Sequence, residues 1–254
     1  MKLTFRPPSV QGMHDDFQPG LDDVDALDGA TPRLFPRVFI AADDETEAGR
    51  DARVLAAVLA GHTEAVAAPE GADLIVTGSA PFGVANRVTL DEIGRAVFES
   101  ARCPVAVAPL RLAERRDYEL RRIDVGIDGG RGAAAAVALA VRLALAHSAR
   151  LRLVAVAQPG FDPVGAPRRA DPHELERLGR HLKQAAESLP GLWVETELRE
   201  GPVDQIILGL AGESDLLLLG SQAAFGNAGR VALGEVAART LRAAPCPTMI
   251  VPAP

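Results

Sequence analysis

The sequence contains few of the residues on which several classes of function depend. Its 254 residues include only two cysteines, Cys103 and Cys246, which excludes a disulfide-rich scaffold and a zinc site with four cysteine ligands. Aromatic residues make up only 4% of the chain, so the core must consist mostly of alanine, valine and leucine. The most apolar long stretch, residues 132–146, is interrupted by Arg142 and is too short to cross a membrane. Residues 1–10 also lack the apolar core of a signal peptide, so we expect a cytoplasmic protein without a membrane partner.

Positive charge and catalytic motifs are also scarce. The chain has 27 lysines and arginines against 34 aspartates and glutamates, and its formal net charge is −7. Because an acidic chain repels phosphodiester backbones, we expect no nucleic-acid partner. No two of the five histidines have the spacing of metal ligands on a helix, so no metal site is expected. The G-x-S-x-G, Walker A and H-E-x-x-H patterns are absent, and we expect no catalytic residues and no enzyme activity.

What the chain does contain is an internal repeat. Residues 82–109 align with residues 225–252 at a constant offset of 143 without a gap, and eleven of the 28 positions are identical. Just upstream, residues 72–79 resemble residues 214–221. Identity at this density predicts a chain of two related halves. Because the two cysteines occupy equivalent positions of the repeat, we interpret them as small buried side chains rather than catalytic thiols.

The repeat divides the chain into four segments. We assign residues 1–36 to a proline- and aspartate-rich extension, 37–110 to a shortened first half, 111–121 to a charged linker and 122–254 to the second half. Residues 37–109 of the first half number 73, whereas the corresponding residues 122–252 of the second half number 131. The first half is therefore too short to contain all the elements of the second half, and we expect it to lack a helix and at least one strand. We expect the extension either to wrap the surface or to remain partly disordered. The arginines of the linker alternate with acidic residues, which is more typical of a solvated segment than of a site for an anionic partner.

The second half alternates between strand and helix patterns. Strands are expected at 122–127, 151–157, 193–198, 215–219 and 248–251, and helices at 133–147, 172–189, 202–210 and 231–243. This order predicts a parallel sheet with helices on both faces, and such sheets bind ligands at the carboxyl ends of their strands. Two strand ends carry glycines and lead into a helix, at residues 128–130 and at residues 220–229. These glycines either hold a phosphate-bearing ligand or only turn the chain.

Two stretches of the second half resemble the universal stress protein family. V-G-I-D-G-G at residues 125–130 is similar to the family's first strand and turn, usually V-x-V-D-G-S. Residues 215–252 are similar to its closing segment, in which a strand ends in G-S, a loop of pattern G-x2-G-x9-G-[ST] follows, and A-P-C-P precedes a last strand. The resemblance implies a flavodoxin-like sheet of strand order 3-2-1-4-5. The predicted fold is therefore two flavodoxin-like, universal stress protein-like parallel-sheet domains in tandem, the first truncated, which form a pseudo-dimer through the final strands at 105–108 and 248–251.

The resemblance also implies a site for an adenine nucleotide, AMP or ATP, in the second half. In family members that bind nucleotides, the aspartate after the first strand meets the adenine, which places Asp128 there. A residue at the end of the second strand lines the base, and here this residue is Val156. The phosphates are expected along the glycine loop and the step after it, which comprise Gly220, Ser221, Gly226, Gly229, Gly234 and Glu235.

The sequence departs from the family pattern where the phosphates are expected. Ala223 replaces the second glycine of the loop, and Glu235 replaces the serine or threonine after the last glycine. A carboxylate at this position repels phosphate oxygens, so we expect weak or absent ATP binding, with AMP less affected. In the first half, Asn86 and Asp91 replace two of the glycines, and Asp128 has no clear counterpart. We therefore expect no nucleotide in the first half.

Two functions remain open from the sequence alone. The first is a stress-response module with a degenerate adenine-nucleotide site in its second half only. The second is a nucleotide-free scaffold that acts through protein–protein contacts and dimerisation. The retained aspartate and glycines favour the first function, whereas the substituted loop positions favour the second. A homodimer in addition to the internal pairing is compatible with both.

Overall fold

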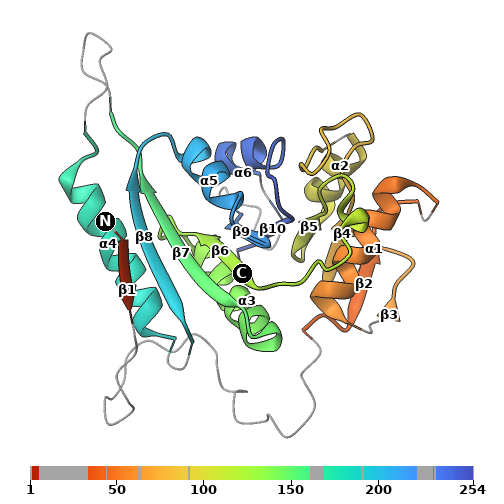
Figure 1. The fold of residues 1–254 in the computed structure, drawn as a ribbon, viewed down its shortest axis with the longest axis horizontal. Coiled ribbons are helices and arrows are strands. Elements are labelled where there is room, and N and C mark those ends of the chain that lie inside the picture. Colours follow the sequence, from red (N-terminus) through yellow and green to blue (C-terminus); the bar gives the residue numbers. More distant parts are fainter. Residues whose placement is uncertain are drawn as a thin grey trace, which may run out of the picture.

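The described part of the chain is built around one long β-sheet (Figure 1). The structure is a computed structural model that describes residues 2–5, 34–43, 45–61, 64–90, 92–160, 169–189, 192–221, 231 and 233–253. Within these residues, ten strands form one sheet in the order β1-β8-β7-β6-β9-β10-β5-β4-β2-β3. The strands are β1 (Lys2–Phe5), β2 (Arg37–Ile40), β3 (Glu64–Ala65), β4 (Leu74–Thr77), β5 (Val105–Val107), β6 (Arg122–Gly126), β7 (Arg150–Ala157), β8 (Val194–Glu200), β9 (Leu216–Gly220) and β10 (Thr248–Val251). The helices are α1 (Glu47–Ala60), α2 (Glu92–Ser100), α3 (Arg131–His147), α4 (Pro172–Glu187), α5 (Val203–Ala211) and α6 (Glu235–Thr240).

The second half has the sheet order that the sequence predicts. Its five strands lie in the order β8-β7-β6-β9-β10, which is 3-2-1-4-5 when they are counted from the start of that half. Each neighbouring pair among them is parallel. The flavodoxin-like fold of this half is therefore confirmed, and the order changes direction beside β6, between β7 and β9.

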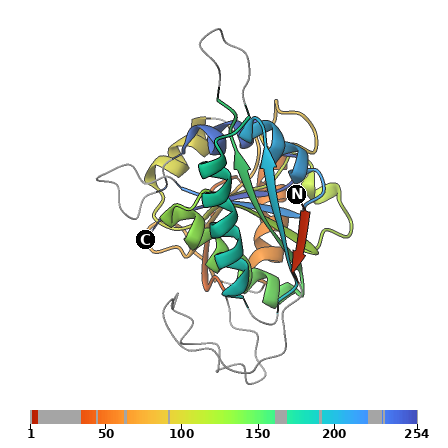
Figure 2. The same ribbon diagram turned by 90° about the vertical axis from the view of Figure 1, so that its left-hand side faces the viewer.

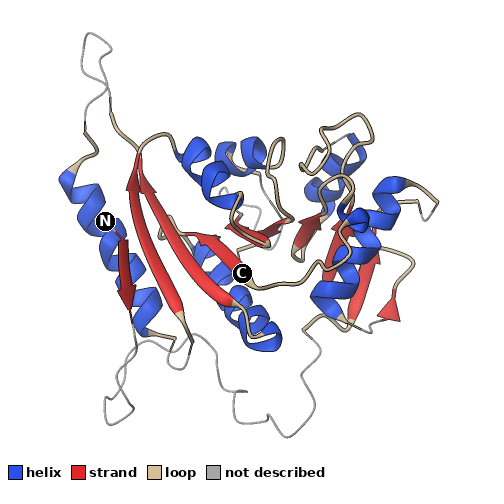
Figure 3. Ribbon diagram, viewed as in Figure 1, coloured by secondary structure: helices blue, strands red, loops and turns tan. Residues whose placement is uncertain are grey.

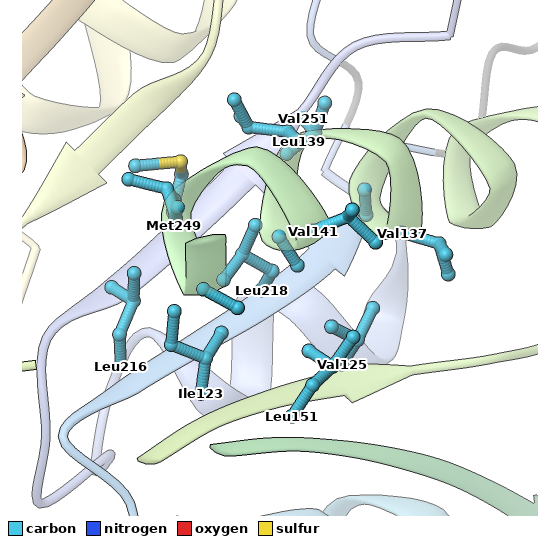
Figure 4. Close-up of a cluster of buried hydrophobic side chains, with 14 of the residues drawn as sticks. Ile123, Val125, Val137, Leu139, Val141, Leu151, Leu216, Leu218, Met249 and Val251 are labelled. Atoms are coloured by element: carbon cyan, nitrogen blue, oxygen red, sulfur yellow. The ribbon is translucent and has the colours of Figure 1, made fainter. Parts of the chain in front are cut away.

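Helices cover both faces of the sheet, as the secondary-structure colours of Figure 3 show. Helices α1, α3 and α4 pack on one face, and α2, α5 and α6 pack on the other. Figure 2, turned by 90°, shows α4 lying across the strands of the second half. Successive residues of a strand point to opposite faces, so on β9 Leu216 and Leu218 join the cluster beneath α3, whereas Leu217 and Leu219 join the other cluster. Figure 4 shows Leu216 and Leu218 below Leu139 and Val141 of α3.

The two halves join through their final strands. Strand β5 pairs antiparallel with β10, and Ala106 lies opposite Met249. Two further hydrogen bonds cross this junction, from Val88 N to the Ala244 carbonyl at 2.8 Å and from Val231 N to the Ala101 carbonyl at 3.0 Å. Donors and acceptors of these two bonds are related by the repeat offset of 143 residues, so the contact is the same on both sides, as in a twofold dimer. The predicted pairing of the final strands is therefore confirmed.

The first half is reduced on the side away from this junction. Its strands lie in the order β5-β4-β2-β3, and β3 contains only two residues, whereas its counterpart β7 contains eight. Among the described residues, no helix lies between β3 and β4, and no third strand lies beyond β3 within the first half. In its described residues, the first half therefore lacks counterparts of β8 and of two helices, α4 and α5, whereas the sequence predicted the loss of one helix and at least one strand. The elements that remain are those that build the junction and the sheet next to it.

The N-terminal extension contributes a strand that the sequence pattern did not predict. Strand β1 pairs antiparallel with β8 at the outer edge of the second half, with Phe5 opposite Val194. Residues 6–33, which were expected to wrap the surface or be disordered, lie outside the described residues. An added strand covers backbone groups of β8 that would otherwise form an open sheet edge.

The charged linker is anchored by a buried carboxylate. Asp51 of α1 is fully buried and accepts hydrogen bonds from Arg111 N at 2.7 Å and Ala113 N at 2.8 Å. Burial raises the pKa of Asp51, and the two backbone N–H groups act in the opposite direction. Leu112 and Leu120 are also buried and hold residues 111–121 to the protein, whereas most residues of the segment are exposed, as the interpretation of a solvated segment predicts. Most of its arginine side chains are exposed, as that interpretation required.

Helix α6 is shorter than expected. The sequence pattern predicted a helix over 231–243, but the helix begins at Glu235 and ends at Thr240. Gly234 has an extended backbone and forms the N-cap. At the other end, Ala243 and Ala244 both bond to the carbonyl of Thr240 in a tightened last turn. Residue 244 precedes a proline, which disfavours helical backbone there.

Candidate functional site

A cavity of about 250 Å³ lies where β6, β7 and β9 end. Four of the predicted site residues line it, namely Asp128, Val156, Gly220 and Gly234. Ser221 and Glu235 are neighbours of lining residues but do not line the cavity themselves. The predicted residues Gly226 and Gly229 lie outside the described residues. The structure thus brings residues from distant parts of the second half to the place where such sheets bind ligands.

Asp128 lies in a tight turn between β6 and α3. Its Oδ1 accepts a hydrogen bond from Gly130 N at 2.7 Å, and its carbonyl accepts one from Nη1 of Arg177 at 3.3 Å. Gly129 has a φ of +84°, and a Cβ atom there would lie 2.6 Å from Nε2 of His181. Only glycine satisfies both conditions. The turn therefore fixes an exposed carboxylate at the mouth of the cavity.

One side of the cavity is apolar. Its lining residues come from β7, α5, β9 and α6, and they are Val154, Val156, Val203, Ile207, Leu219 and Val236. Val154 and Ile207 are almost fully buried, and Val156 is half-buried. An apolar slot with a few polar groups at its rim is the usual form of a site for a flat aromatic ligand. Val156 lines this side of the cavity, and its contact with a base stays a prediction.

Gly220 is required by packing, whatever the cavity binds. A Cβ atom on Gly220 would lie 2.2 Å from the carbonyl carbon of Gly132, and one on Gly132 would lie 2.2 Å from the oxygen of Ser221. The end of β9 and the start of α3 therefore touch backbone to backbone. Ser221 is 3% exposed, and its N–H donates to the carbonyl of Val251 at 2.7 Å. These two residues hold the cavity floor in place, a role that neither of the sequence-based interpretations included.

Glu235 lies at the first position of α6 with its side chain in solvent. The side chain is 77% exposed and forms an ion pair with Arg239 one turn later. Arg239 in turn pairs with Asp204 of α5 at 3.0 Å. A carboxylate in the first turn of a helix is stabilised by the helix dipole. The geometry therefore gives Glu235 a structural role, and its negative charge remains next to Gly234.

Three polar residues on the rim were not predicted. Gln158 follows β7, and Glu174 and Arg177 belong to the first turns of α4. Asp171 caps α4 and accepts a hydrogen bond from His173 N at 2.9 Å. The start of α4 follows a parallel strand, as does the start of α3. Because a helix that follows a parallel strand begins at the carboxyl edge of the sheet, this connection alone could have placed Glu174 and Arg177 there.

The statement that Asp128 has no first-half counterpart is wrong. The β-sheet register pairs Val38 with Leu74 and Ile123 with Leu216, and Leu74 and Leu216 are equivalent in the repeat. Asp43 lies five residues after Val38, and Asp128 lies five residues after Ile123. The two aspartates therefore occupy equivalent positions. Oδ1 of Asp43 accepts a hydrogen bond from Glu45 N at 3.0 Å, which is the same turn as in the second half.

The first half nevertheless lacks the apolar wall of the cavity. Its strand β3 ends at Ala65, well before a position that could correspond to Val156. Among the described residues it also has no counterpart of α5, which supplies Val203 and Ile207. The absence of a nucleotide from the first half therefore stays a prediction, now based on the missing wall instead of a missing aspartate.

The remaining chemistry of the described residues is limited. Cys246 is buried, and burial raises the pKa of the half-buried Cys103 thiol to about 11, which fits small packed side chains. No three histidine, cysteine, aspartate or glutamate side chains in the described ranges are grouped to hold a metal ion. None of the helices in those ranges is long and apolar enough to span a membrane.

The fold and the cavity define a flavodoxin-like α/β protein with a ligand-sized space at the carboxyl edge of its sheet. A model of the universal stress protein family matches residues 119–252, which is more than half of the chain. The chain therefore belongs to the universal stress protein family. The match lies in the second half and its linker, and the assignment of residues 37–110 to a repeat of the same family stays a prediction.

Solved structures of universal stress proteins share the fold. A putative universal stress protein from Pseudomonas aeruginosa is 15% identical, with a TM-score of 0.57, over 87% of this chain and 94% of its own. One from Archaeoglobus fulgidus is 18% identical, with a TM-score of 0.56, over 73% of this chain but only 64% of its own. A universal stress protein in complex with cAMP is 25% identical over 52% of this chain and 96% of its own, with a TM-score of 0.38. A comparison with curated proteins found no match.

Proposed function

We propose that this chain is a cytoplasmic stress-response module without catalytic activity that binds an adenine nucleotide of low charge, AMP in preference to ATP. The observation that carries the proposal is the cavity beside Asp128. It combines a carboxylate fixed by a turn with an apolar slot from β7, α5 and β9. The slot suits the adenine ring, and the carboxylate can accept a hydrogen bond from its amino group.

The charges around the cavity favour a ligand with few phosphates. The lining includes two acidic side chains, Asp128 and Glu174, against one basic side chain, Arg177. Glu235 adds a further negative charge beside Gly234. Each added phosphate brings more negative charge into this acidic surrounding. We therefore expect the order of affinity to be AMP above ATP, with uncharged adenosine retained.

Calorimetric titration of the full chain with adenosine, AMP and Mg-ATP tests the function. We expect saturable binding of AMP with a stoichiometry of one and clearly weaker binding of ATP. A ligand at about 100 times its dissociation constant stabilises the folded state by about 2.7 kcal/mol, so a thermal-shift assay provides a second readout. Tight ATP binding would contradict the charge argument, and no binding of any of the three would overturn the proposed function.

Removing the charge of Glu235 is expected to improve ATP binding. A unit charge about 4 Å from a phosphate contributes about 1 kcal/mol in water, which corresponds to about fivefold in affinity. Because the side chain is exposed and paired with Arg239, the water value applies to Glu235→Ser. Titration with Mg-ATP should show this gain, and adenosine affinity should not change. Glu235→Gln is the matched control that keeps the side-chain size, and equal ATP affinity in all three proteins would show that Glu235 acts only on the helix.

A nucleotide-free scaffold is the second candidate function. Phe82 is 78% exposed and Val84 is 64% exposed, and both lie in the loop of the first half that corresponds to the glycine loop. Large apolar side chains in such exposed positions favour a protein contact. This function would become the better supported one if the titrations showed no nucleotide binding.

A further inference from the structure

Helix α6 forms part of the cavity wall but is too short to hold its own position. Gly234, Val236 and Ala237 at its start line the cavity. The helix has six residues, and helices of this length are not stable by themselves in water. Within the second half it packs against α5, through the ion pair of Arg239 with Asp204 among other contacts. The position of α6 therefore depends on its hydrogen bonds and ion pairs with residues outside the helix.

The first half supplies such bonds at both ends of α6. Before the helix, Val231 N donates to the carbonyl of Ala101, which follows α2. After the helix, Val88 N donates to the carbonyl of Ala244 at 2.8 Å, and Nη1 of Arg87 donates to the carbonyl of Ala243 at 2.7 Å. Ala244 is fully buried and Val231 is 5% exposed, so these bonds are largely shielded from water. The short helix is thus fastened from both sides by the same neighbouring unit.

We propose that the first half is a positioning element for the cavity of the second half and that Arg87 is a positioning residue for ligand binding. The inference rests on the proposed function, because it concerns the same cavity. Arg87 does not line the cavity. It holds the turn that follows α6 through the Ala243 carbonyl, and the start of that helix forms part of the cavity wall. In this proposal the first half contributes to ligand binding in the second half, although it has no complete site of its own.

Arg87→Ala tests the inference with an exposed side chain whose loss does not disturb the core. We expect the dissociation constant of AMP to rise at least about threefold, since the guanidinium bond to Ala243 is charge-assisted. Arg37→Ala is the matched control, because Arg37 is another exposed arginine of the first half, paired with Asp73 at 3.0 Å and distant from α6 in the sheet order. It should leave the dissociation constant within a factor of about two. Arg87→Lys keeps a charged donor and should recover most of the affinity.

Hydrogen exchange separates this inference from the proposed function. The amides of Ala238, Leu241 and Ala244 report on α6, and they should exchange faster in Arg87→Ala than in Arg37→Ala, with or without ligand. If the native chain bound no AMP, the proposed function would be rejected. The exchange rates of the α6 amides would still show whether Arg87 holds α6 in position. Unchanged α6 exchange in Arg87→Ala, or equal weakening of AMP binding by both alanine variants, would overturn the inference.

Discussion

Arg152→Met is expected to lower the free energy of unfolding by about 3–5 kcal/mol at pH 8, because it leaves a buried carboxylate without its partner. Arg152 of β7 is 3% exposed, and its guanidinium forms two hydrogen bonds with Asp124 of β6, which is 1% exposed. The same guanidinium donates to the carbonyl of Leu210 at 3.0 Å and lies 3.6 Å from the buried carboxylate of Glu197. Methionine keeps an unbranched apolar chain in place of the arginine stem but forms none of these bonds.

The loss of stability should depend on pH in a defined direction. Burial raises the pKa of Asp124, and hydrogen bonds from Arg152 and Ser214 oppose the rise. Without Arg152 the main opposing group is gone, so Asp124 holds its proton to higher pH in the folded chain than in the unfolded chain. A carboxyl with a raised folded pKa contributes stability at low pH and loses it as the pH rises through that pKa. The deficit of Arg152→Met should therefore be smaller at pH 5 than at pH 8.

Urea unfolding of both proteins at the two pH values measures this effect. Arg121→Met is the control, because Arg121 pairs with Glu119 on the surface, with both side chains more than half exposed. Removing such a surface pair costs at most about 1 kcal/mol. A cost this small for Arg152→Met, without a dependence on pH, would contradict the assignment of a buried ionic cluster.

Asp128→Ala is expected to weaken AMP binding about tenfold or more. The carboxylate is the polar group that the proposed function assigns to the adenine, and a hydrogen bond to a charged group contributes about 1.5–3 kcal/mol. The substitution also removes the acceptor that holds Gly130 N in the turn. In a thermal-shift assay with AMP at about 100 times the native dissociation constant, a tenfold loss of affinity should lower the stabilisation from about 2.7 to about 1.4 kcal/mol.

The repeat provides a matched control for this experiment. Asp43→Ala removes the equivalent carboxylate and turn of the first half, which has no apolar wall beside it. AMP should stabilise this variant as much as it stabilises the native chain. An unchanged shift in Asp128→Ala would reject the assignment of Asp128, and loss of the shift in Asp43→Ala would show that the first half binds the nucleotide.

The sequence predicted those parts of the fold that depend on local patterns and on the repeat. The alternation of strands and helices predicted a parallel sheet in the second half, and the resemblance to the family implied its strand order. The repeat at 82–109, together with that resemblance, predicted the pairing of β5 with β10. Strand β1 was missed because its partner β8 lies about 190 residues away, and no local pattern specifies such a pairing. Of the four predicted site residues that line the cavity, Asp128, Val156 and Gly220 lie at or just after the ends of strands that the sheet order brings together, and Gly234 caps α6.

The rest of the site depends on tertiary contacts that a motif does not contain. Asp43 was missed because no glycine follows it, so the first half does not show the D-G-G pattern at 128–130. Its equivalence to Asp128 appears only in the pairing of β2 with β4. Gly220 was assigned to a ligand, although the backbone of Gly132 already excludes any side chain there. Arg87 is one of the identical positions of the repeat, but this identity does not reveal its contact with the Ala243 carbonyl, which spans 156 residues.

The covalent connection between β5 and β10 changes how the molecule behaves on dilution. In a homodimer this interface forms between two chains, so the fraction assembled falls as the protein concentration falls. Here both strands belong to one chain, and the local concentration of each strand at the other is fixed by the linker. Equivalent positions of the two halves can also change independently in a tandem chain, as the sequence shows with Asp91 at the position equivalent to Gly234. We therefore expect the ligand occupancy of the second half to follow a one-site isotherm at any protein concentration.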